Sequence, residues 1–145
     1  MSRRRRYSGK SQSLIAARLV QPRREWVYYT NRIRREVARL MRMPLEDIYD
    51  VRLKEHQLWV SYRGADGKTC STFFSYRRLP LWQELVVSKI CACRNRRELA
   101  RFSVAMRWEY RNFCYPIAMR EIIDETLDNQ GCELDWAASA GEAAC

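Results

Sequence analysis

The chain has 145 residues, a net charge of +10 and 47% hydrophobic residues. This length is typical of one domain whose core is stable without disulfides or metal, and the hydrophobic content excludes wholesale disorder. No stretch approaches the roughly 20 apolar residues of a membrane span, and residues 14–20 are too short for a signal-peptide core. We therefore expect an intracellular protein, cytoplasmic or nuclear, that does not bind membranes.

The charge is distributed unevenly along the chain. Residues 1–111 carry 26 Lys and Arg against 10 Asp and Glu, whereas residues 112–145 carry one Arg against seven acids. Of the 27 basic residues 23 are Arg, whose planar guanidinium matches phosphates and base edges and stacks on rings. A basic body of this kind favours a polyanionic partner, in particular nucleic acid.

The first 23 residues are rich in Arg and Ser and contain no acid. We expect a disordered basic arm that is attracted to phosphate, with Arg3, Arg4, Arg5 and Arg6 among its contacts. A nuclear-import patch and an organellar transit peptide are the alternatives. Four consecutive arginines spoil the amphipathic spacing of a transit helix, which favours the arm.

The ordered domain is predicted to span residues 24–130 and to begin with a helix that ends before Pro44. The apolar face of this helix is Trp26, Tyr29, Ile33, Val37 and Leu40. The opposite face carries a basic row, the first stripe, made of Tyr28, Arg32, Arg35, Arg39 and Arg42. Few acids are available to balance this row, so phosphate contact is favoured over simple solvation.

After the first helix the apolar period becomes two, which predicts strands over residues 48–54, 57–63 and 69–77 in an antiparallel meander. The Asp66-Gly67 step predicts a type I′ hairpin, because both residues tolerate positive φ. If the loop has an even length, one face carries Leu58, Val60, Tyr62 and Phe73, and the other carries Trp59, Arg63, Cys70, Phe74 and Tyr76.

The two faces of this predicted sheet differ in character. We expect the face of Leu58 to be core. The rings around Arg63 on the other face suit stacked bases, although helices covering that face would make them core instead. We favour core, because several amphipathic helices need a surface to pack on.

The helical period returns in the last third of the chain. It predicts a short helix over residues 80–91, a longer one after Asn95, and a last one from Pro116 that ends at Gly131. A flexible acidic tail over residues 131–145 is expected to follow. The outer face of the longer helix is the second stripe: Arg94, Arg97, Arg101, Trp108 and Arg111.

The sequence gives little support for catalysis. Its six cysteines contain no C-x-x-C pair and its one histidine, His56, has no zinc-ligand spacing. There is no Gly-rich phosphate loop, no G-x-S-x-G, no H-E-x-x-H and no carboxylate cluster in the basic body. We predict a non-enzyme without catalytic residues, cofactor or metal.

Two short segments resemble known proteins. Trp59, Gly67-Lys68, Phe73-Phe74 and the helix over residues 81–90 resemble the three-stranded DNA-reading domains of AP2-type factors and integrase arms, without their Ala-rich helix. Residues 24–29 resemble a stretch of an adenoviral early regulatory protein that binds a host phosphatase. Neither resemblance assigns a family.

The sequence therefore predicts an α+β fold: an N-terminal helix, a three-stranded antiparallel β-meander, then three helices packed on the sheet. It favours non-catalytic binding of DNA or RNA by a regulatory or accessory protein, and its compactness is typical of viral and mobile-element proteins. The candidate binding residues are the arm arginines, both stripes and Arg63. The alternative is an interaction adaptor whose basic face binds an acidic protein partner.

Overall fold

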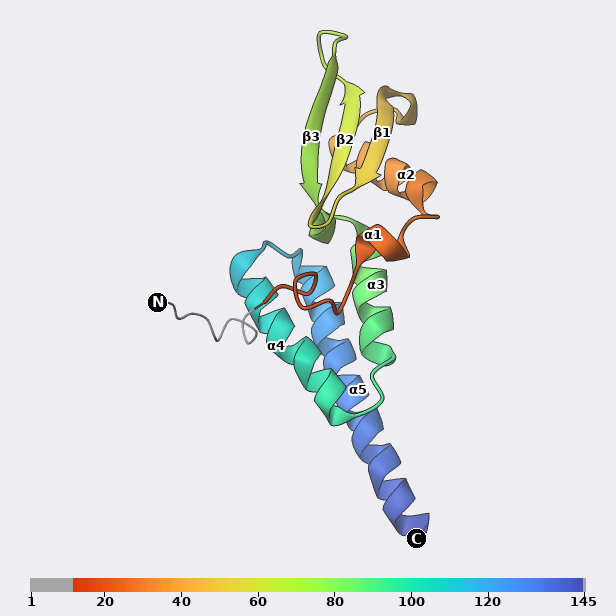
Figure 1. The fold of residues 1–145 in the computed structure, drawn as a ribbon, viewed down its shortest axis with the longest axis vertical. Coiled ribbons are helices and arrows are strands. Elements are labelled where there is room, and N and C mark those ends of the chain that lie inside the picture. The colour runs from red at the N-terminus through yellow and green to blue at the C-terminus, as the bar shows by residue number, and fades with distance from the viewer. Residues whose placement is uncertain (1–11, 145) are drawn as a thin grey trace, which may run out of the picture. The chain divides into compact units, whose positions relative to one another are not determined.

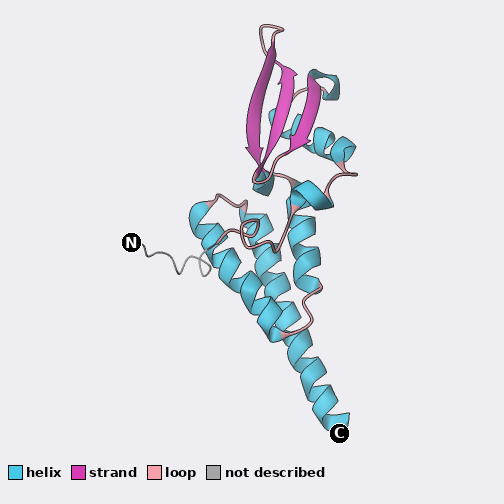
Figure 2. Ribbon diagram, in the orientation of Figure 1, coloured by secondary structure: helices cyan, strands magenta, loops and turns pink. Residues whose placement is uncertain are grey.

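The computed structural model describes residues 12–144 (Figure 1). These residues form an α+β protein with a three-stranded antiparallel sheet and five α-helices, coloured by type in Figure 2. The elements are α1 (Pro22–Glu25), α2 (Thr30–Met41), β1 (Ile48–Leu53), β2 (Gln57–Arg63), β3 (Thr69–Ser75), α3 (Pro80–Cys91), α4 (Arg96–Asn112) and α5 (Ile117–Ala144). They divide into two compact units: a sheet unit, residues 21–82, and a helical unit, residues 12–20 with 83–144.

The sheet unit contains the predicted meander, with strand order β1-β2-β3. One face is apolar because Leu58 and Val60 of β2 are both fully buried. Helix α2 packs against β1 at this sheet (Figure 1), and its Ile33 and Val37 are fully buried. Alternation in the strands and helical spacing in α2 thus place their apolar side chains in one core.

The predicted side assignment of β3 is wrong. Leu58 pairs with Phe74, and Trp59 pairs with Phe73, so Phe74 belongs to the core face and Phe73 to the outer face. The reason is that the loop has an odd number of residues. Five residues, 64–68, separate the paired Arg63 and Thr69, and an odd loop exchanges the two faces of β3 relative to an even one.

The hairpin turn also differs from the predicted type I′. Gly67 has a φ of +83°, whereas Asp66 does not have a positive φ. The Gly67 N–H donates to the carbonyl oxygen of Gly64 at 2.9 Å, so the turn is centred on residues 65–66 and is followed by a left-handed glycine. This is the arrangement of a longer hairpin loop, in which only the glycine needs positive φ.

The predicted first helix, whose apolar face includes Trp26 and Tyr29, is helical only from Thr30 onward. Residues 26–29 separate α1 from α2, and Trp26 leaves the helical path to join a buried aromatic cluster. Its ring centroid lies 5.3 Å from that of Tyr76 and 6.4 Å from that of Trp82, both edge to face. Burial of these large rings outweighs the continuation of one regular helix.

The helical unit has a core between α4 and α5, which pack on each other. Helix α5 continues through Gly131 to Ala144, so the predicted helix end at Gly131 is wrong. Gly131 is buried, and a Cβ there would lie 3.1 Å from Nη1 of Arg96. It therefore permits close packing of α4 rather than ending α5. Arg96 Nη2 also pairs with Asp135 Oδ2 at 2.6 Å, one turn farther along α5.

Residues 12–20 pack within the helical unit. Leu14, Ile15 and Val20 are buried, and the Leu14 N–H donates to Oε2 of Glu109 at 3.0 Å. The predicted disordered arm is therefore wrong for residues 12–23, because apolar residues follow its arginines and find a surface on α4. Its remainder, with Arg3, Arg4, Arg5 and Arg6, lies outside the described residues.

Two further predictions concern the packing of the C-terminal helices and the absence of a membrane-spanning helix. Packing of the three C-terminal helices on the sheet stays a prediction. Among residues 12–144, no helix has the length and apolar character needed to cross a membrane.

Candidate nucleic-acid interface

The first stripe lies along α2 and its two ends. Arg35 and Arg39 are exposed on the helix, and Arg42 is the exposed left-handed residue that ends it, with a φ of 56°. Tyr28 precedes the helix and is 95% exposed. Within residues 12–144, no acidic side chain forms an ion pair with Arg35, Arg39 or Arg42.

Arg32 differs from the rest of the stripe because a buried carboxylate holds it. Its Nε lies 2.9 Å from Oε2 of Glu36. The other oxygen, Oε1, accepts a hydrogen bond from the Leu81 N–H in the first turn of α3 at 3.2 Å. Negative charge is favourable at a helix N-terminus, so Glu36 has a structural role and fixes one guanidinium at the same time.

These arginines border a small pocket on the sheet unit. Arg32, Arg35 and Arg39 line it together with Glu36 and Pro80, and its volume is about 290 Å³. Arg32 is oriented by Glu36, whereas the other two arginines have no acidic partner among the described residues. In this arrangement an anionic oxygen can accept hydrogen bonds from several guanidinium groups at once.

The outer face of the sheet carries the last predicted site residue of this unit, Arg63, which is exposed. Four residues earlier on β2, on the same face, lies Trp59, half-buried and directly opposite Phe73 of β3, which is 55% exposed. An even loop length predicts Phe73 on the opposite face. A loop of five residues, 64–68, predicts it on the face of Trp59, as observed.

Two other residues predicted for this face lie elsewhere. Tyr76 is fully buried in the aromatic cluster, where its hydroxyl donates to the carbonyl oxygen of Lys54. Cys70 pairs with Tyr62 across the strands and therefore shares the core-side face with it. Strand pairing, which the sequence pattern left ambiguous by one residue, decides the side of Cys70, whereas Tyr76 lies beyond the end of β3 in a short helical turn.

The second stripe lies on and before α4 in the helical unit. Arg97, Arg101 and Arg111 are exposed, and Trp108 is half-buried with its ring centroid 5.9 Å from that of Phe113. Arg94 contacts Glu98 twice, through its backbone N–H at 2.8 Å and through Nη2 at 3.3 Å.

These contacts from Arg94 have an electrostatic consequence. The hydrogen bond from the Arg94 backbone N–H holds the pKa of Glu98 below its ordinary value. The hydrogen bond from the Arg94 side chain has the same effect to a smaller extent. Glu98 stays charged and pairs with Arg94, so Arg94 is the least available arginine of the stripe for a partner.

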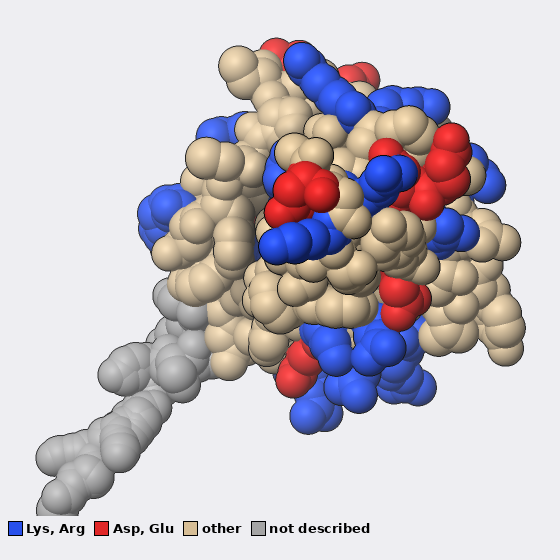
Figure 3. Space-filling view, turned by 90° about the horizontal axis from the view of Figure 1, so that it is seen from above, with Lys and Arg blue, Asp and Glu red and all other residues tan. Residues whose placement is uncertain are grey.

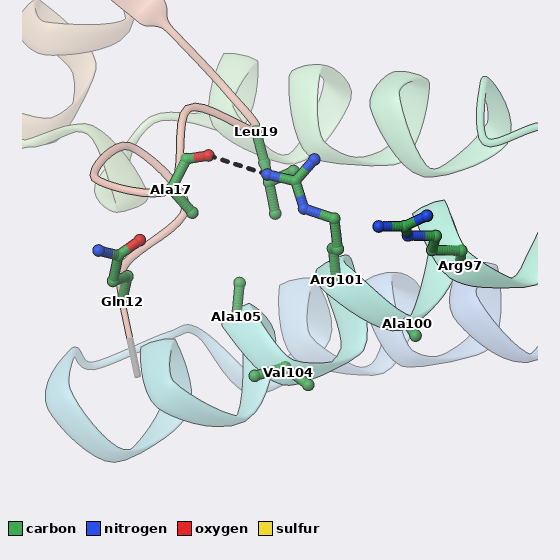
Figure 4. Close-up of a pocket in the computed structure, with 8 residues that line it drawn as sticks. All are labelled: Gln12, Ala17, Leu19, Arg97, Ala100, Arg101, Val104 and Ala105. Carbon is green, nitrogen blue, oxygen red and sulfur yellow. Dashed lines mark hydrogen bonds between the residues drawn. The ribbon is translucent and has the colours of Figure 1, made fainter. Parts of the chain in front are cut away.

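A groove runs between residues 12–20 and α4 (Figure 4). Its volume is about 520 Å³, and its wall is mainly apolar. Arg97 and Arg101 lie along one side, and Nη2 of Arg101 donates to the carbonyl oxygen of Ala17 at 3.3 Å. The sequence could not predict this groove, because residues 12–20 were assigned to an unpacked arm. The lining residues are Gln12, Ala17, Leu19, Arg97, Ala100, Arg101, Val104 and Ala105.

The surface charge is grouped rather than uniform. Figure 3 shows lysine and arginine side chains in several separate groups, with acidic side chains beside some of them. The sheet unit by itself has 13 basic residues against seven acidic ones. A polyanion would therefore meet distinct basic patches rather than one even field.

The thiols of the described residues show no sign of a metal centre. No group of three His, Cys, Asp or Glu side chains within residues 12–144 could hold an ion. Cys93 is buried, and burial, followed by the nearby Glu98, raises the pKa of its thiol. A raised pKa makes a thiol less reactive as a nucleophile.

Comparisons of the chain with known protein families, with curated proteins and with solved structures found no match. Evidence for its function has to come from its own residues and contacts.

Proposed function

We propose that this chain is a non-catalytic nucleic-acid-binding protein of a regulatory or accessory kind, and that the first stripe contacts the phosphate backbone. The observation that carries the proposal is the exposure of Arg35, Arg39 and Arg42 without acidic partners in the described part of the chain. Tyr28, 95% exposed just before α2, adds a ring at the opposite end of the helix from Arg39 and Arg42.

The physical argument concerns what these guanidiniums gain from a partner. Exposed arginines that already pair with acids would have to break those pairs before they bound phosphate. Arg35 and Arg39 have none to break, and Arg32 is held in place by Glu36, so less side-chain freedom is lost on binding. The pocket that these three arginines line is a suitable position for one phosphate group.

The test is the salt dependence of binding after removal of two stripe arginines. Arg35→Ala with Arg39→Ala should weaken binding to duplex and single strands alike. It should also flatten the slope of log affinity against log salt by about one unit per lost phosphate contact. Affinities for one duplex and one single strand, measured at several salt concentrations by fluorescence anisotropy, check this.

A matched control removes the same charge from the same unit. Arg24→Ala with Lys68→Ala changes two exposed residues outside the stripe. The control should change the slope less than the stripe variant does. An equal change in both variants would show that only the total charge matters, and an unchanged slope in the stripe variant would contradict the proposed contact.

The groove on the helical unit favours a second candidate function, binding of an acidic polypeptide. Its apolar wall suits apolar side chains, and Arg97 and Arg101 along one side suit carboxylates. A labelled peptide of alternating Glu and Leu residues is a direct probe.

A negative charge introduced inside the groove tests this candidate. Val104→Glu should abolish binding of the peptide and leave nucleic-acid binding unchanged, because Val104 lines the groove and is 40% exposed. Ile117→Glu is the matched control, at an exposed apolar position of α5 outside the groove. Equal loss of peptide binding in the two variants would contradict the assignment to the groove.

A further inference from the structure

The outer face of the sheet is the feature that the first stripe does not account for. It is formed by every second residue of the strands, and within the sheet unit α2 packs on the apolar side instead. Two aromatic rings lie on this face, directly opposite each other on adjacent strands: Trp59, half-buried, and Phe73, 55% exposed. Large rings exposed side by side on a monomer surface are uncommon and mark interaction sites.

The polar residues around these rings are mostly basic. Arg52 lies opposite Trp59, and its guanidinium carbon is 5.1 Å from the centre of the Trp59 ring. Arg63 lies four residues after Trp59 on the same strand and is exposed. Among the described strand residues of this face, the only acid is Asp50, whose Oδ2 pairs with Nε of Arg52 at 3.0 Å.

The rest of the face is small and uncharged. Ser61 of β2 is buried, and the remaining residues of β2 and β3 on this face, which are exposed or half-buried, are Gln57, Thr69, Ser71 and Ser75. Such residues leave the rings accessible from above and can donate hydrogen bonds to base edges. Flat rings with arginine beside them match the two parts of an unpaired nucleotide, because bases stack on aromatic faces and phosphates pair with guanidinium.

We infer that the outer face of the sheet binds single-stranded nucleic acid by stacking unpaired bases on Trp59 and Phe73, with Arg63 on a flanking phosphate and Arg52, held by Asp50, beside the Trp59 ring. This inference rests on the proposed nucleic-acid function and adds a preference for unpaired strands. Paired bases are stacked on each other and cannot reach the rings, so a duplex does not use this face.

The experiment compares single strands with a duplex in ring-removing variants. Trp59→Ala and Phe73→Ala should each weaken binding of oligo(dT) and oligo(U) by roughly 5- to 150-fold, the equivalent of one stacked base. Binding of a duplex of equal length should be unchanged. Equal losses on the duplex and the single strands, or no loss on either single strand, would overturn the inference. A loss on oligo(dT) or oligo(U) alone would support it and identify the polymer.

Two control variants separate stacking from altered folding. Trp59→Phe keeps an aromatic ring and should retain most of the single-strand affinity. Ser71→Ala changes an exposed residue of β3 on the same face and should have no effect. If Trp59→Ala instead lowers the urea midpoint of unfolding to the level expected of a core tryptophan, the face is covered in the folded protein and the inference is wrong.

A spectroscopic readout reports contact with the ring itself. Stacking of a base should quench Trp59 emission when oligo(dT) is added. The quench should be lost in Trp59→Phe although that variant still binds. An identical quench in Trp59→Phe would place the base on another tryptophan and overturn the assignment.

The failure of this inference can be distinguished from failure of the proposed function. If the unaltered protein binds duplex and single strands with the same salt slope, and only the Arg35→Ala with Arg39→Ala variant changes it, the stripe binds phosphate and the sheet face does not bind bases. If the unaltered protein binds neither polymer, the proposed function itself falls.

Discussion

Two buried carboxylates are used inside the protein and do not neutralise the exposed arginines of the first stripe. Glu36 bonds the Leu81 N–H and holds Arg32, and Glu109, 0% exposed, accepts hydrogen bonds from the Leu14 N–H and the Tyr115 hydroxyl. Buried carboxylates need such donors, since an unsatisfied one is strongly destabilising. Because Glu36 and Glu109 are buried, they do not neutralise exposed arginines such as Arg35 and Arg39.

Tyr76 predicts a specific alkaline behaviour. Burial raises the pKa of its hydroxyl well above the ordinary value near 10, and the nearby charge of Arg23 opposes this shift less strongly. The folded state therefore holds the proton more tightly than the unfolded state does. The resulting stability is complete below a pH of about 10, and it is lost as the pH rises from there toward the folded-state pKa.

Replacing the hydroxyl checks this behaviour. Tyr76→Phe should lower the free energy of unfolding at neutral pH by about 1 kcal/mol, because the Lys54 carbonyl loses its donor. It should also flatten the fall in stability above the ordinary tyrosine pKa. Urea unfolding across neutral and alkaline pH measures both effects. Tyr28→Phe, at a 95% exposed position, is the control and should leave the pH dependence unchanged.

At the scale of elements, the segment over residues 12–20 determines how much of the N-terminus can be removed. Leu14 is fully buried and Ile15 is 6% exposed, and the backbone of Leu14 supplies a donor to Glu109. Deletion of residues 1–20 should lower the free energy of unfolding by more than about 3 kcal/mol, since it exposes apolar surface and leaves a buried carboxylate short of a partner.

The matched deletion ends where the described segment begins. Removal of residues 1–11 takes away the four consecutive arginines and keeps Leu14. We expect the melting temperature to change little and the affinity for a polyanion to fall. Thermal unfolding and salt-dependent binding of the two deletions measure this. Equal melting temperatures would contradict the packing role of residues 12–20.

At the scale of the whole molecule, the two stripes belong to different units. The first lies on the sheet unit and the second on the helical unit. If both contact one polyanion, combining Arg35→Ala and Arg39→Ala with Arg97→Ala and Arg101→Ala should add the two losses of salt slope in a complex with one strand per protein. Binding isotherms at several salt concentrations measure the slope and the stoichiometry.

Two results would contradict a shared polyanion. One is a combined variant with the same slope as the Arg35→Ala and Arg39→Ala pair alone. The other is a second pair, Arg97→Ala with Arg101→Ala, that spares nucleic acid and abolishes binding of the acidic peptide. The latter would assign the second stripe to a protein partner.

Local pattern alone determined most of the elements. Alternation marked the three strands to within a few residues, and helical spacing marked α3 and α4, because a side chain's face follows directly from the period of the backbone. Composition determined the excess of arginine. Exposure of Arg35, Arg39, Arg97 and Arg101 follows from the same periodicity, since the apolar side of each helix is buried.

Tertiary structure decided what depends on distant partners. Only strand pairing placed Phe73 beside Trp59, and only packing on α4 turned residues 12–20 from an arm into part of a core. The same holds for Gly131, which reads as a helix end in sequence but allows Arg96 and Leu99 of α4 to approach α5. In each case the deciding energy is burial against residues far away in the chain, which a local pattern does not contain.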